Sequence, residues 1–353
     1  MKNWKNFYGG LTTGSGSLLG KDSLFSYGDK AINLYKKSIL KNLKITKIPI
    51  KNNYNILDVG TGRQALAFSQ ISNGNIDHID LSHIHVQKTK RTAKKNKIKN
   101  INSIQQNLDN CKKFKKETYD LIYLQGIIQH FKNPQTTLEN ILSSLKVGGY
   151  AWLYIYKSGT YRQYIDHLIR NSIMNILKKP PNIKDVQKIK KFLSLKKYNK
   201  FEVDSFIDGI FTKFSWLYNN NQIMKCFVQS GFKIIHKKSC YKKKQHYDHS
   251  DKWGAFIFSI KKTNDKKIKL KSLNPKKSCK EPLRQYKKNK IITRTEKLLN
   301  ELMNTKLSKN EKIDNLFKLF SISLANNVNK KTNLKHEPLQ KFLIKKLNEK
   351  KIT

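Results

Sequence analysis

The chain has 353 residues, which is enough for one large domain with a full hydrophobic core, or for a domain with an appendage. Its hydrophobic content of 38% and aromatic content of 10% exclude an intrinsically disordered protein. No stretch of about eighteen apolar residues occurs, so we predict no membrane span, and the Gly/Ser/Thr-rich residues 1–20 lack the apolar run of a signal peptide.

The formal net charge of +48 is compatible with two interpretations, a surface selected for nucleic acid or a lysine-rich codon bias. Lysine provides 66 of the 72 basic residues, and asparagine and isoleucine are also abundant. Proteins that recognise nucleic acid tend to use arginine for bidentate and stacking contacts. The scarcity of arginine therefore favours the compositional interpretation.

Cysteine usage indicates neither a disulfide framework nor a zinc site. The four cysteines are scattered and form no CxxC pair, at Cys111, Cys226, Cys240 and Cys279. This usage is typical of a reducing compartment, so we predict a cytoplasmic protein.

The other candidate metal ligands are histidines, and we predict no metal site. His246 and His249 lie close in sequence to Asp248 and Asp251, but such a lysine-rich segment is more often simply exposed. His83 and His85 begin a predicted helix, and we interpret them as structural.

The first half of the chain reads as helices and strands in alternation. A loose arm (1–20) and one or two helices within 22–43 precede the first strand. The elements that follow are a strand (54–59), a helix (63–72), a strand (75–80), a helix that Ser82 caps and that ends near residue 96, and a strand (101–106).

The second half continues the alternation and then changes character. We predict strands at 119–124 and 150–156, separated by a helix that starts at Asn133-Pro134 and is ended by Val147-Gly148-Gly149. Further predicted elements are a helix (161–177), a basic stretch with another helix (178–200), a helix (220–230), an antiparallel strand pair (232–237 and 253–260), and Lys-rich helical pieces near 291–302, 309–324 and 334–347.

A glycine loop between an apolar strand and a helix is the segment that most directly indicates ligand binding. Gly60 and Gly62 allow a tight turn and close approach to a ligand, and the helix that begins near Arg63 points amide groups toward it. Asp80, about twenty residues after the first glycine, can accept hydrogen bonds from two ribose hydroxyls. We therefore predict a nucleoside-bearing cofactor at the carboxyl ends of a parallel sheet. The same glycines and Ala65 also fit the dinucleotide fingerprint, which leaves an NAD(P)-dependent oxidoreductase as an alternative.

Five segments in order resemble the class I S-adenosylmethionine-dependent methyltransferases over about residues 50–262. They are the runs 55–62, 79–82, 119–134, 142–156 and Gly231-Phe232 with the strand that follows. The resemblance implies an α/β fold, with a doubly wound, Rossmann-like, mostly parallel seven-stranded sheet and a C-terminal antiparallel hairpin. We divide the chain into an N-terminal arm with helices (1–50), the methyltransferase domain (51–262) and a Lys-rich helical appendage (263–353).

The resemblance also implies a cofactor, S-adenosylmethionine, and residues that hold it. One residue departs from the pattern, because Gln64 stands where the family often has a third glycine. The implied roles are Gly60, Thr61 and Gly62 around the methionine part, Asp58 orienting their loop, Asp80 on the ribose, Leu81 on the adenine, Asn107 and Leu108 near the adenine amine, and Gln125 near the transferable methyl.

His130 is the candidate general base, because its loop follows the fourth strand at the carboxyl edge. The alternative is a histidine that only orders this loop or packs on Phe131. No other titratable residue in the motifs suits that role as well.

The acceptor is predicted by elimination. The loop after the fourth strand reads Leu124-Gln125-Gly126-Ile127, not the Asp/Asn-Pro-Pro-aromatic run of enzymes that methylate nucleobase amines, and no cysteine lies near a strand end to attack cytosine carbon. A small molecule, sugar or lipid is favoured, and an RNA-associated methyltransferase or binding protein is the alternative. The helix with Tyr161, Arg162, Gln163, Tyr164, His167 and Arg170 could contact the acceptor, and the C-terminal helices could form an interface.

Overall fold

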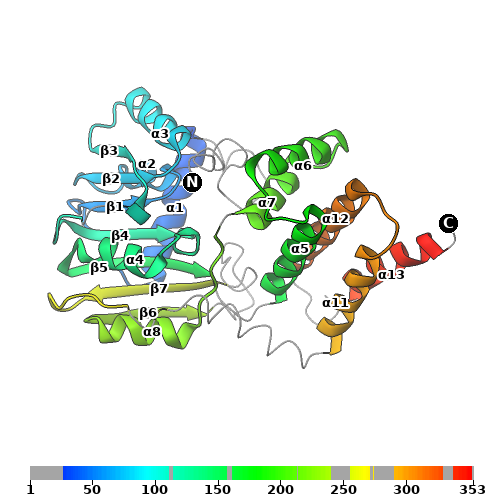
Figure 1. Cartoon of the computed structure of the whole chain (residues 1–353). Helices are drawn as coiled ribbons and strands as arrows, with labels where there is room; N and C mark the ends of the chain where they lie inside the picture. The colour runs from blue at the N-terminus through cyan, green and yellow to red at the C-terminus, as the bar shows by residue number, and fades with distance from the viewer. Residues whose placement is uncertain are drawn as a thin grey trace.

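The computed structural model describes residues 27–110, 114–156, 161–212, 214–239, 255–270, 273, 290–328 and 337–351. It contains a seven-stranded sheet in the order β3-β2-β1-β4-β5-β7-β6 (Figure 1). Strands β1 to β5 are parallel, and β7 pairs antiparallel with both β5 and β6. The predicted doubly wound α/β sheet with a closing antiparallel hairpin is therefore confirmed.

The first half of the sheet is built outward from β1 in the middle. The chain runs from the centre toward one edge through crossover helices, and it then returns to the other side of β1. The elements are α1 (Asp29–Ile45), β1 (Ile56–Val59), α2 (Arg63–Phe68), β2 (Ile76–Asp80), α3 (His83–Lys95), β3 (Ile101–Gln105) and the one-turn helix η4 (Leu108–Asn110). This reversal places the topological switch point between β1 and β4, where ligands bind in such sheets.

The second half completes the sheet, adds α4 and α8 on one of its faces and, among the described residues, adds six helices that form a separate core. Its elements are β4 (Tyr119–Gln125), the one-turn helix η5 (Ile128–His130), α4 (Pro134–Ser143), β5 (Leu145–Tyr156), α5 (Tyr161–Leu177), α6 (Ile183–Leu195), α7 (Lys200–Phe211), α8 (Asn220–Gln229), β6 (Phe232–Ser239), β7 (Ala255–Lys262), α11 (Lys290–Met303), α12 (Lys309–Val328) and α13 (Glu337–Lys351).

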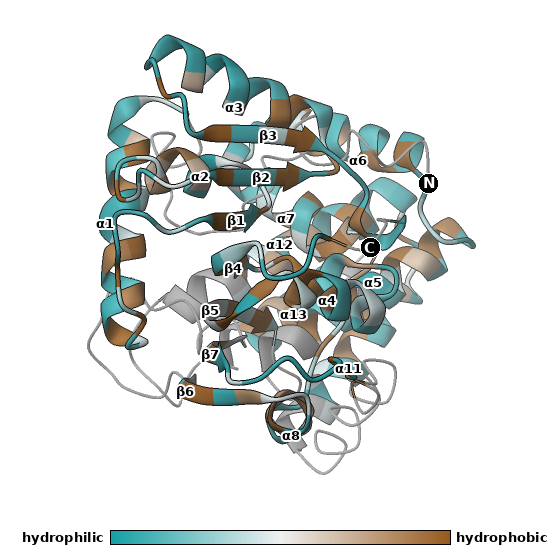
Figure 2. Cartoon of the chain, turned by 90° about the vertical axis from the view of Figure 1, so that its left-hand side faces the viewer, coloured by the Kyte–Doolittle hydropathy of each residue, from teal (hydrophilic) through white to brown (hydrophobic). Residues whose placement is uncertain are grey.

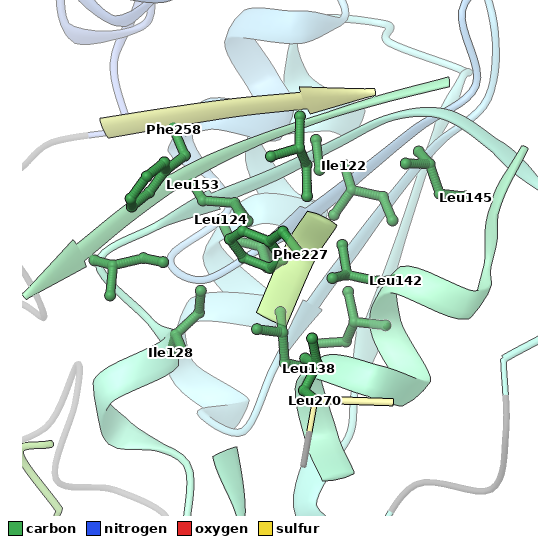
Figure 3. Packing of buried hydrophobic residues seen from close by; sticks show 14 of the residues in the cluster. Ile122, Leu124, Ile128, Leu138, Leu142, Leu145, Leu153, Phe227, Phe258 and Leu270 are labelled. Carbon is green, nitrogen blue, oxygen red and sulfur yellow. The ribbon is translucent and has the colours of Figure 1, made fainter. Parts of the chain in front are cut away.

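Helices cover both faces of the sheet with apolar side chains. On one face, α1, α2 and α3 bury Ile39, Phe68 and Ala93 against the strands. On the other face, Leu138 and Leu142 of α4 and Phe227 of α8 pack against β4, β5 and β7 (Figure 3). In Figure 2, β1 is largely brown and α3, which covers the sheet, is largely teal on its outer side.

The C-terminal helices share a second hydrophobic core with the helices that follow β5. Phe206 of α7 contacts Phe317 and Phe320 of α12, with ring centroids 5.5 and 5.2 Å apart. The same cluster includes Ile169 of α5 and Leu339 of α13. Figure 1 shows α5, α6, α7, α11, α12 and α13 grouped beside the sheet. The boundary at residue 262 stays a prediction, but helices on its two sides bury one common core.

Three local expectations differ from the structure. The helix that begins at Arg63 ends at Phe68, because the chain then turns and the Ser72 hydroxyl donates to Asn52 and Tyr54 before β1. Gly148 and Gly149 do not end a helix; they lie in an irregular first part of β5, where Gly148 has φ +84°. Helix α7, directly after the basic stretch, was not predicted at all.

Helix α4 begins where predicted, but the side chain of Asn133 does not cap it. Asn133 occupies the N-cap position without a side-chain hydrogen bond. The Asp109 carboxylate instead accepts hydrogen bonds from the amides of Lys132 and Asn133 and from the Thr137 hydroxyl, at 2.9 to 3.0 Å. A carboxylate from η4 thus holds the two residues that precede α4 and one side chain of its first turns.

Some predictions lie outside the described residues. They concern the arm (1–20), the segment with His246 and His249, and three of the cysteines; Cys226 is buried and forms no disulfide. Within the described part of the chain, no helix combines the length and apolarity that crossing a bilayer would require.

We predict that Phe317→Ala lowers the free energy of unfolding by about 3–5 kcal/mol. The Phe317 side chain is fully buried between Phe206 and Tyr198, so its removal leaves a cavity in the core that the two helical segments share. Urea denaturation followed by circular dichroism measures the change.

Leu195→Ala is the control, because Leu195 lies on α6 with 72% of its surface exposed. It is expected to change the free energy by no more than about 0.5 kcal/mol. Equal effects of the two variants would contradict the common core.

Candidate functional site

The candidate site lies at the carboxyl ends of β1 and β4. These strands are parallel neighbours, and Val59 is paired with Leu124 at their last common position. Gly60 and Gln125 therefore emerge side by side at the switch point of the sheet. The structure brings together the predicted site residues from β1, β2 and β4 in this region.

In the loop after β1, position 62 has no room for a side chain, whereas space is available beside Gly60. Gly62 has φ +80°, and a Cβ atom there would lie 2.1 Å from Thr89 Oγ1 and 2.8 Å from His78 Cε1. Gly60 has φ +142°, and a Cβ atom on it would meet no atom within 4 Å. The loop is thus pressed against β2 and α3 on one side and leaves room for a ligand on the other.

Asp58, in β1, connects the strand to the helix that follows the loop. Its carboxylate is fully buried and accepts a hydrogen bond from the amide of Ala65 at 3.0 Å. Burial raises the pKa of Asp58 to about 7, and the nearby charge of Asp80 acts in the same direction, while the Ala65 amide opposes both. The hydrogen bond connects the end of β1 to the first turn of α2, and the orienting role stays a prediction.

Asp80 ends β2 with its carboxylate beside the start of α3. One oxygen accepts from the Ser82 amide at 2.6 Å, and the other lies 3.1 Å from His85 Nδ1. Ser82 also caps α3 through its hydroxyl, as predicted. Each carboxylate oxygen has a further lone pair, so Asp80 can still accept hydrogen bonds from a ligand.

His85 is a partner of Asp80 that the sequence analysis did not identify. Its side chain is almost fully buried, and its Nε2 atom contacts no hydrogen-bonding partner among the described residues. The five-residue spacing from Asp80 was visible in the sequence. It was not interpretable there, because the pair forms only when α3 folds back along β2.

His78 and Tyr27 are two further residues that sequence reasoning missed. His78 Nε2 lies 2.6 Å from the carbonyl oxygen of Gly60, and its Nδ1 lies 2.7 Å from Ser103 Oγ. The Tyr27 hydroxyl donates to the carbonyl oxygen of Thr61 at 2.6 Å. A polar side chain at an inward position of β2 was the only available signal for His78.

Asn107 and Leu108 follow β3, where the resemblance places the adenine. The Asn107 side-chain oxygen accepts from the Asp109 amide at 3.1 Å, which starts η4. Leu108 is buried in the cluster beneath α4. The Gln106 amide donates to the Asp80 carbonyl, so this turn is connected to the end of β2, where Leu81 is half-buried.

Gln64 and Gln125 form a pair across the switch point. Gln64, in the first turn of α2, is 8% exposed, and its Nε2 donates to Gln125 Oε1 at 3.0 Å. The position where the family often has glycine thus holds a side chain that reaches to β4.

Both ring nitrogens of His130 contact protein groups. Nδ1 donates to the Phe214 carbonyl at 2.9 Å, and Nε2 lies 3.2 Å from the side-chain nitrogen of Gln129. Burial lowers the pKa of His130 to about 4. A neutral ring that accepts from Gln129 matches the loop-ordering alternative, and the base role stays a prediction.

The segment after α7 is tied to the loop after β4. The Trp216 amide donates to the Gln129 carbonyl at 3.0 Å, and its indole nitrogen donates to the Phe131 carbonyl at 2.8 Å. The Tyr218 amide donates to the Tyr156 carbonyl at the end of β5. The connection from the helical core thus crosses the carboxyl edge of β4 and β5.

His167 and Arg170 of α5 face helices instead of the sheet edge. The Arg170 guanidinium donates to the carbonyl oxygens of Gly209 and Thr212, at the end of α7. His167 Nε2 lies 3.0 Å from the side-chain nitrogen of Asn171, and burial lowers the pKa of the ring. The contacts of Arg170 stabilise the helical core.

Within the residues that the structure describes, no three His, Cys, Asp or Glu side chains gather as a metal site would require.

Two comparisons return known proteins. A family model described as a methyltransferase domain matches residues 50–195. The search among curated proteins gave no match.

Several solved structures resemble the chain at low sequence identity. An S-adenosylmethionine-dependent methyltransferase from Mesorhizobium loti is 13% identical, with 63% of this chain and 96% of that one covered and a TM-score of 0.42. One from Aquifex aeolicus is 14% identical, with 69% and 95% covered and a TM-score of 0.39. A Burkholderia thailandensis 1,6-didemethyltoxoflavin-N1-methyltransferase is 10% identical, with 66% and 78% covered and a TM-score of 0.38.

The raised pKa of Asp58 predicts a pH dependence of stability. The folded chain keeps the Asp58 proton up to about pH 7, whereas an unfolded chain releases it near the ordinary carboxyl pKa of 3.8. The contribution of Asp58 is therefore fully present below about pH 4 and is lost as the pH rises to about 7. Asp58→Asn is expected to remove this decline, because the amide oxygen can still accept from Ala65.

Urea denaturation at pH 4.5, 6 and 8 measures this dependence. Asp29→Asn, at an exposed position in α1, is the control and is expected to leave the decline unchanged. A decline that persists unchanged in Asp58→Asn would refute the assignment.

Proposed function

We propose that this chain, which carries a methyltransferase domain, is a class I S-adenosylmethionine-dependent enzyme that transfers the methyl group to a small molecule, a sugar or a lipid at the carboxyl edge of β4 and β5. The main evidence for the cofactor site is the structure of the loop after β1. A space beside Gly60 adjoins two backbone amides, and the carboxylate of Asp80 follows at the end of the next strand.

The polar groups present suit this cofactor. The amides of Thr61 and Gly62 have no hydrogen-bond acceptor among the described residues, so they can donate to the methionine part. Asp80 can accept from the two ribose hydroxyls through its remaining lone pairs. Gly60 has no side chain to fill the space between these groups, which supports a nucleoside with an amino-acid tail as the ligand.

The adenine is assigned to the ends of β2 and β3. Leu81 would pack on the ring, and Asn107 and Leu108 would line its edge. These assignments follow the resemblance in the sequence, and the connection between Gln106 and Asp80 supports them, because it holds the two strand ends together.

The bound cofactor supplies a methyl group on a positively charged sulfur, which is a strong electrophile. The protein's task is then mainly to hold the acceptor in line with that methyl group, and proximity provides much of the rate. Gln125 and Gly126, at the end of β4, lie where the two substrates would meet. His130 orders the loop behind them through Gln129 and Phe214, and it would act as a base only after releasing Gln129.

Half-buried aromatic side chains support a small acceptor. The Tyr154 ring approaches to 3.5 Å from the position a Cβ atom on Gly126 would take, and the Tyr154 and Tyr156 rings lie 6.2 Å apart in an edge-to-face arrangement. Such rings favour an acceptor with an apolar or planar part. The low arginine content supports this class over RNA, and the scattered cysteines support the cytoplasm as the compartment.

The helices on both sides of residue 262 would serve this site as one unit. Helix α5 follows the carboxyl end of β5, and the segment after α7 contacts the loop after β4. The unit is therefore connected to the sheet at the edge where the acceptor would bind. We assign it to acceptor recognition, with the cofactor site formed by the strands β1 to β4 and the segments that adjoin them.

We predict that the protein binds S-adenosylhomocysteine and does not bind NADH. Calorimetry with the first ligand and fluorescence titration with the second, both on the full chain, provide the test. A folded protein that gives no heat with millimolar S-adenosylhomocysteine would refute the proposed function, and saturable NADH binding would favour the oxidoreductase alternative.

We expect Asp80→Ala to weaken S-adenosylhomocysteine binding by about 1–3 kcal/mol, because it removes charge-assisted hydrogen bonds to the ribose. Asp77→Ala is the control on the same strand, since Asp77 accepts from Asn102 and Tyr119 away from the loop. An equal dissociation constant for Asp80→Ala and the unmodified protein would show that the ribose does not bind there.

A further inference from the structure

Two consecutive carbonyl groups of the loop after β1 are bound by side chains from outside the loop. His78, in β2, contacts the carbonyl oxygen of Gly60, and Tyr27, which precedes α1, contacts the carbonyl oxygen of Thr61. Both distances are 2.6 Å. Neither side chain belongs to the glycine motif or follows from the resemblance.

The contacts of His78 define its hydrogen-bonding state. A carbonyl oxygen only accepts, so Nε2 carries the proton that it donates to Gly60. Burial lowers the pKa of the ring, which is therefore neutral near pH 7, and Nδ1 accepts from the Ser103 hydroxyl. The ring is fully buried, and its Cε1 atom lies 2.8 Å from the position a Cβ atom on Gly62 would take, so the ring packs against the loop.

Tyr27 contacts the next peptide group, between Thr61 and Gly62, and two cations lie near its ring. The Arg63 guanidinium lies 5.3 Å and the Lys88 ammonium 5.8 Å from the centre of its ring. Burial raises the pKa of the hydroxyl, so Tyr27 remains a donor at neutral pH. Two cations near an aromatic ring favour this placement electrostatically.

A contact that orients the carbonyl group of a peptide unit also orients the amide group of the same unit. In a trans peptide the C=O and N–H groups point in opposite directions. The Thr61 amide therefore points away from His78, and the Gly62 amide points away from Tyr27. Both amides lack an acceptor among the described residues, and they adjoin the space beside Gly60.

We propose that His78 and Tyr27 are positioning residues for the cofactor: by binding the carbonyl oxygens of Gly60 and Thr61, they aim the amides of Thr61 and Gly62 at the carboxylate-bearing methionine part. This inference rests on the proposed function. It predicts that their loss weakens ligands that contain the methionine part, while ligands that contain only the nucleoside keep their affinity for Asp80.

The test compares S-adenosylhomocysteine with adenosine, which lacks that part, by calorimetry on the full chain. His78→Leu is expected to raise the dissociation constant of S-adenosylhomocysteine about 10-fold or more and that of adenosine no more than about twofold. His78→Gln, which can place an amide N–H near the Nε2 position, is expected to recover most of the loss. A structural defect alone would weaken both ligands alike.

Tyr27→Phe provides a milder variant, with Tyr35→Phe as its matched control. Each removes one hydroxyl, but the Tyr35 hydroxyl accepts from Arg63 at 3.4 Å and contacts no loop carbonyl. Tyr27→Phe is expected to weaken S-adenosylhomocysteine about fivefold and to leave adenosine unchanged, and Tyr35→Phe to affect neither. Thermal melts confirm that each variant is folded.

The outcomes separate the inference from the proposed function. Should the unmodified protein bind neither ligand, the proposed function fails and the inference fails with it. Should it bind both, while Tyr27→Phe behaves like Tyr35→Phe or His78→Leu weakens adenosine as much as S-adenosylhomocysteine, only the inference is overturned. If His78→Leu does not fold, the tyrosine pair alone decides.

Discussion

The left-handed turn at Gly62 is the constraint on which the site depends. With φ +80° and no space for a Cβ atom against Thr89 and His78, this position accepts only glycine, and the close contact presses the loop onto β2 and α3. The same contact brings His78 under Gly60 and directs the start of α2, where Ala65 donates to Asp58. Strand order then adds the remaining groups, because β2 and β4 flank β1 and end at the same edge.

The second hydrophobic core buries the apolar faces of helices that do not pack on the sheet. Helices α5 to α7 are inserted between β5 and α8, and their apolar faces cannot reach the sheet, which α1 to α4 and α8 already cover. The segment after β7 returns to bury those faces, so that residues as distant as Phe206 and Phe320 come into contact. The connection through Trp216 then ties this helical core to the loop after β4.

The sequence predicted what depends on local pattern and missed what depends on contacts between distant segments. Alternating apolar runs, the Ser82 cap and the glycine loop define the sheet, and those signals lie within a few residues of the elements that they specify. The contacts of His78 with Gly60 and of Asp80 with His85 need β2 beside β1 and α3 against β2, which no local pattern encodes. The contacts of Asp109 with the residues that precede α4 were missed for the same reason, since Asp109 is distant in sequence.

Gln64 shows how a departure from the family's pattern can be absorbed and used. A side chain at the third glycine position would obstruct the loop if it turned toward Gly60, but here it extends to β4 and donates to Gln125. That hydrogen bond fixes the Gln125 amide with its oxygen toward α2, and it leaves the amide nitrogen as the group that faces away from the pair. The end of β4 therefore presents a donor where the two substrates would meet, beside the Tyr154 ring. An acceptor with a lone pair near its reacting atom is the kind that such a donor can orient.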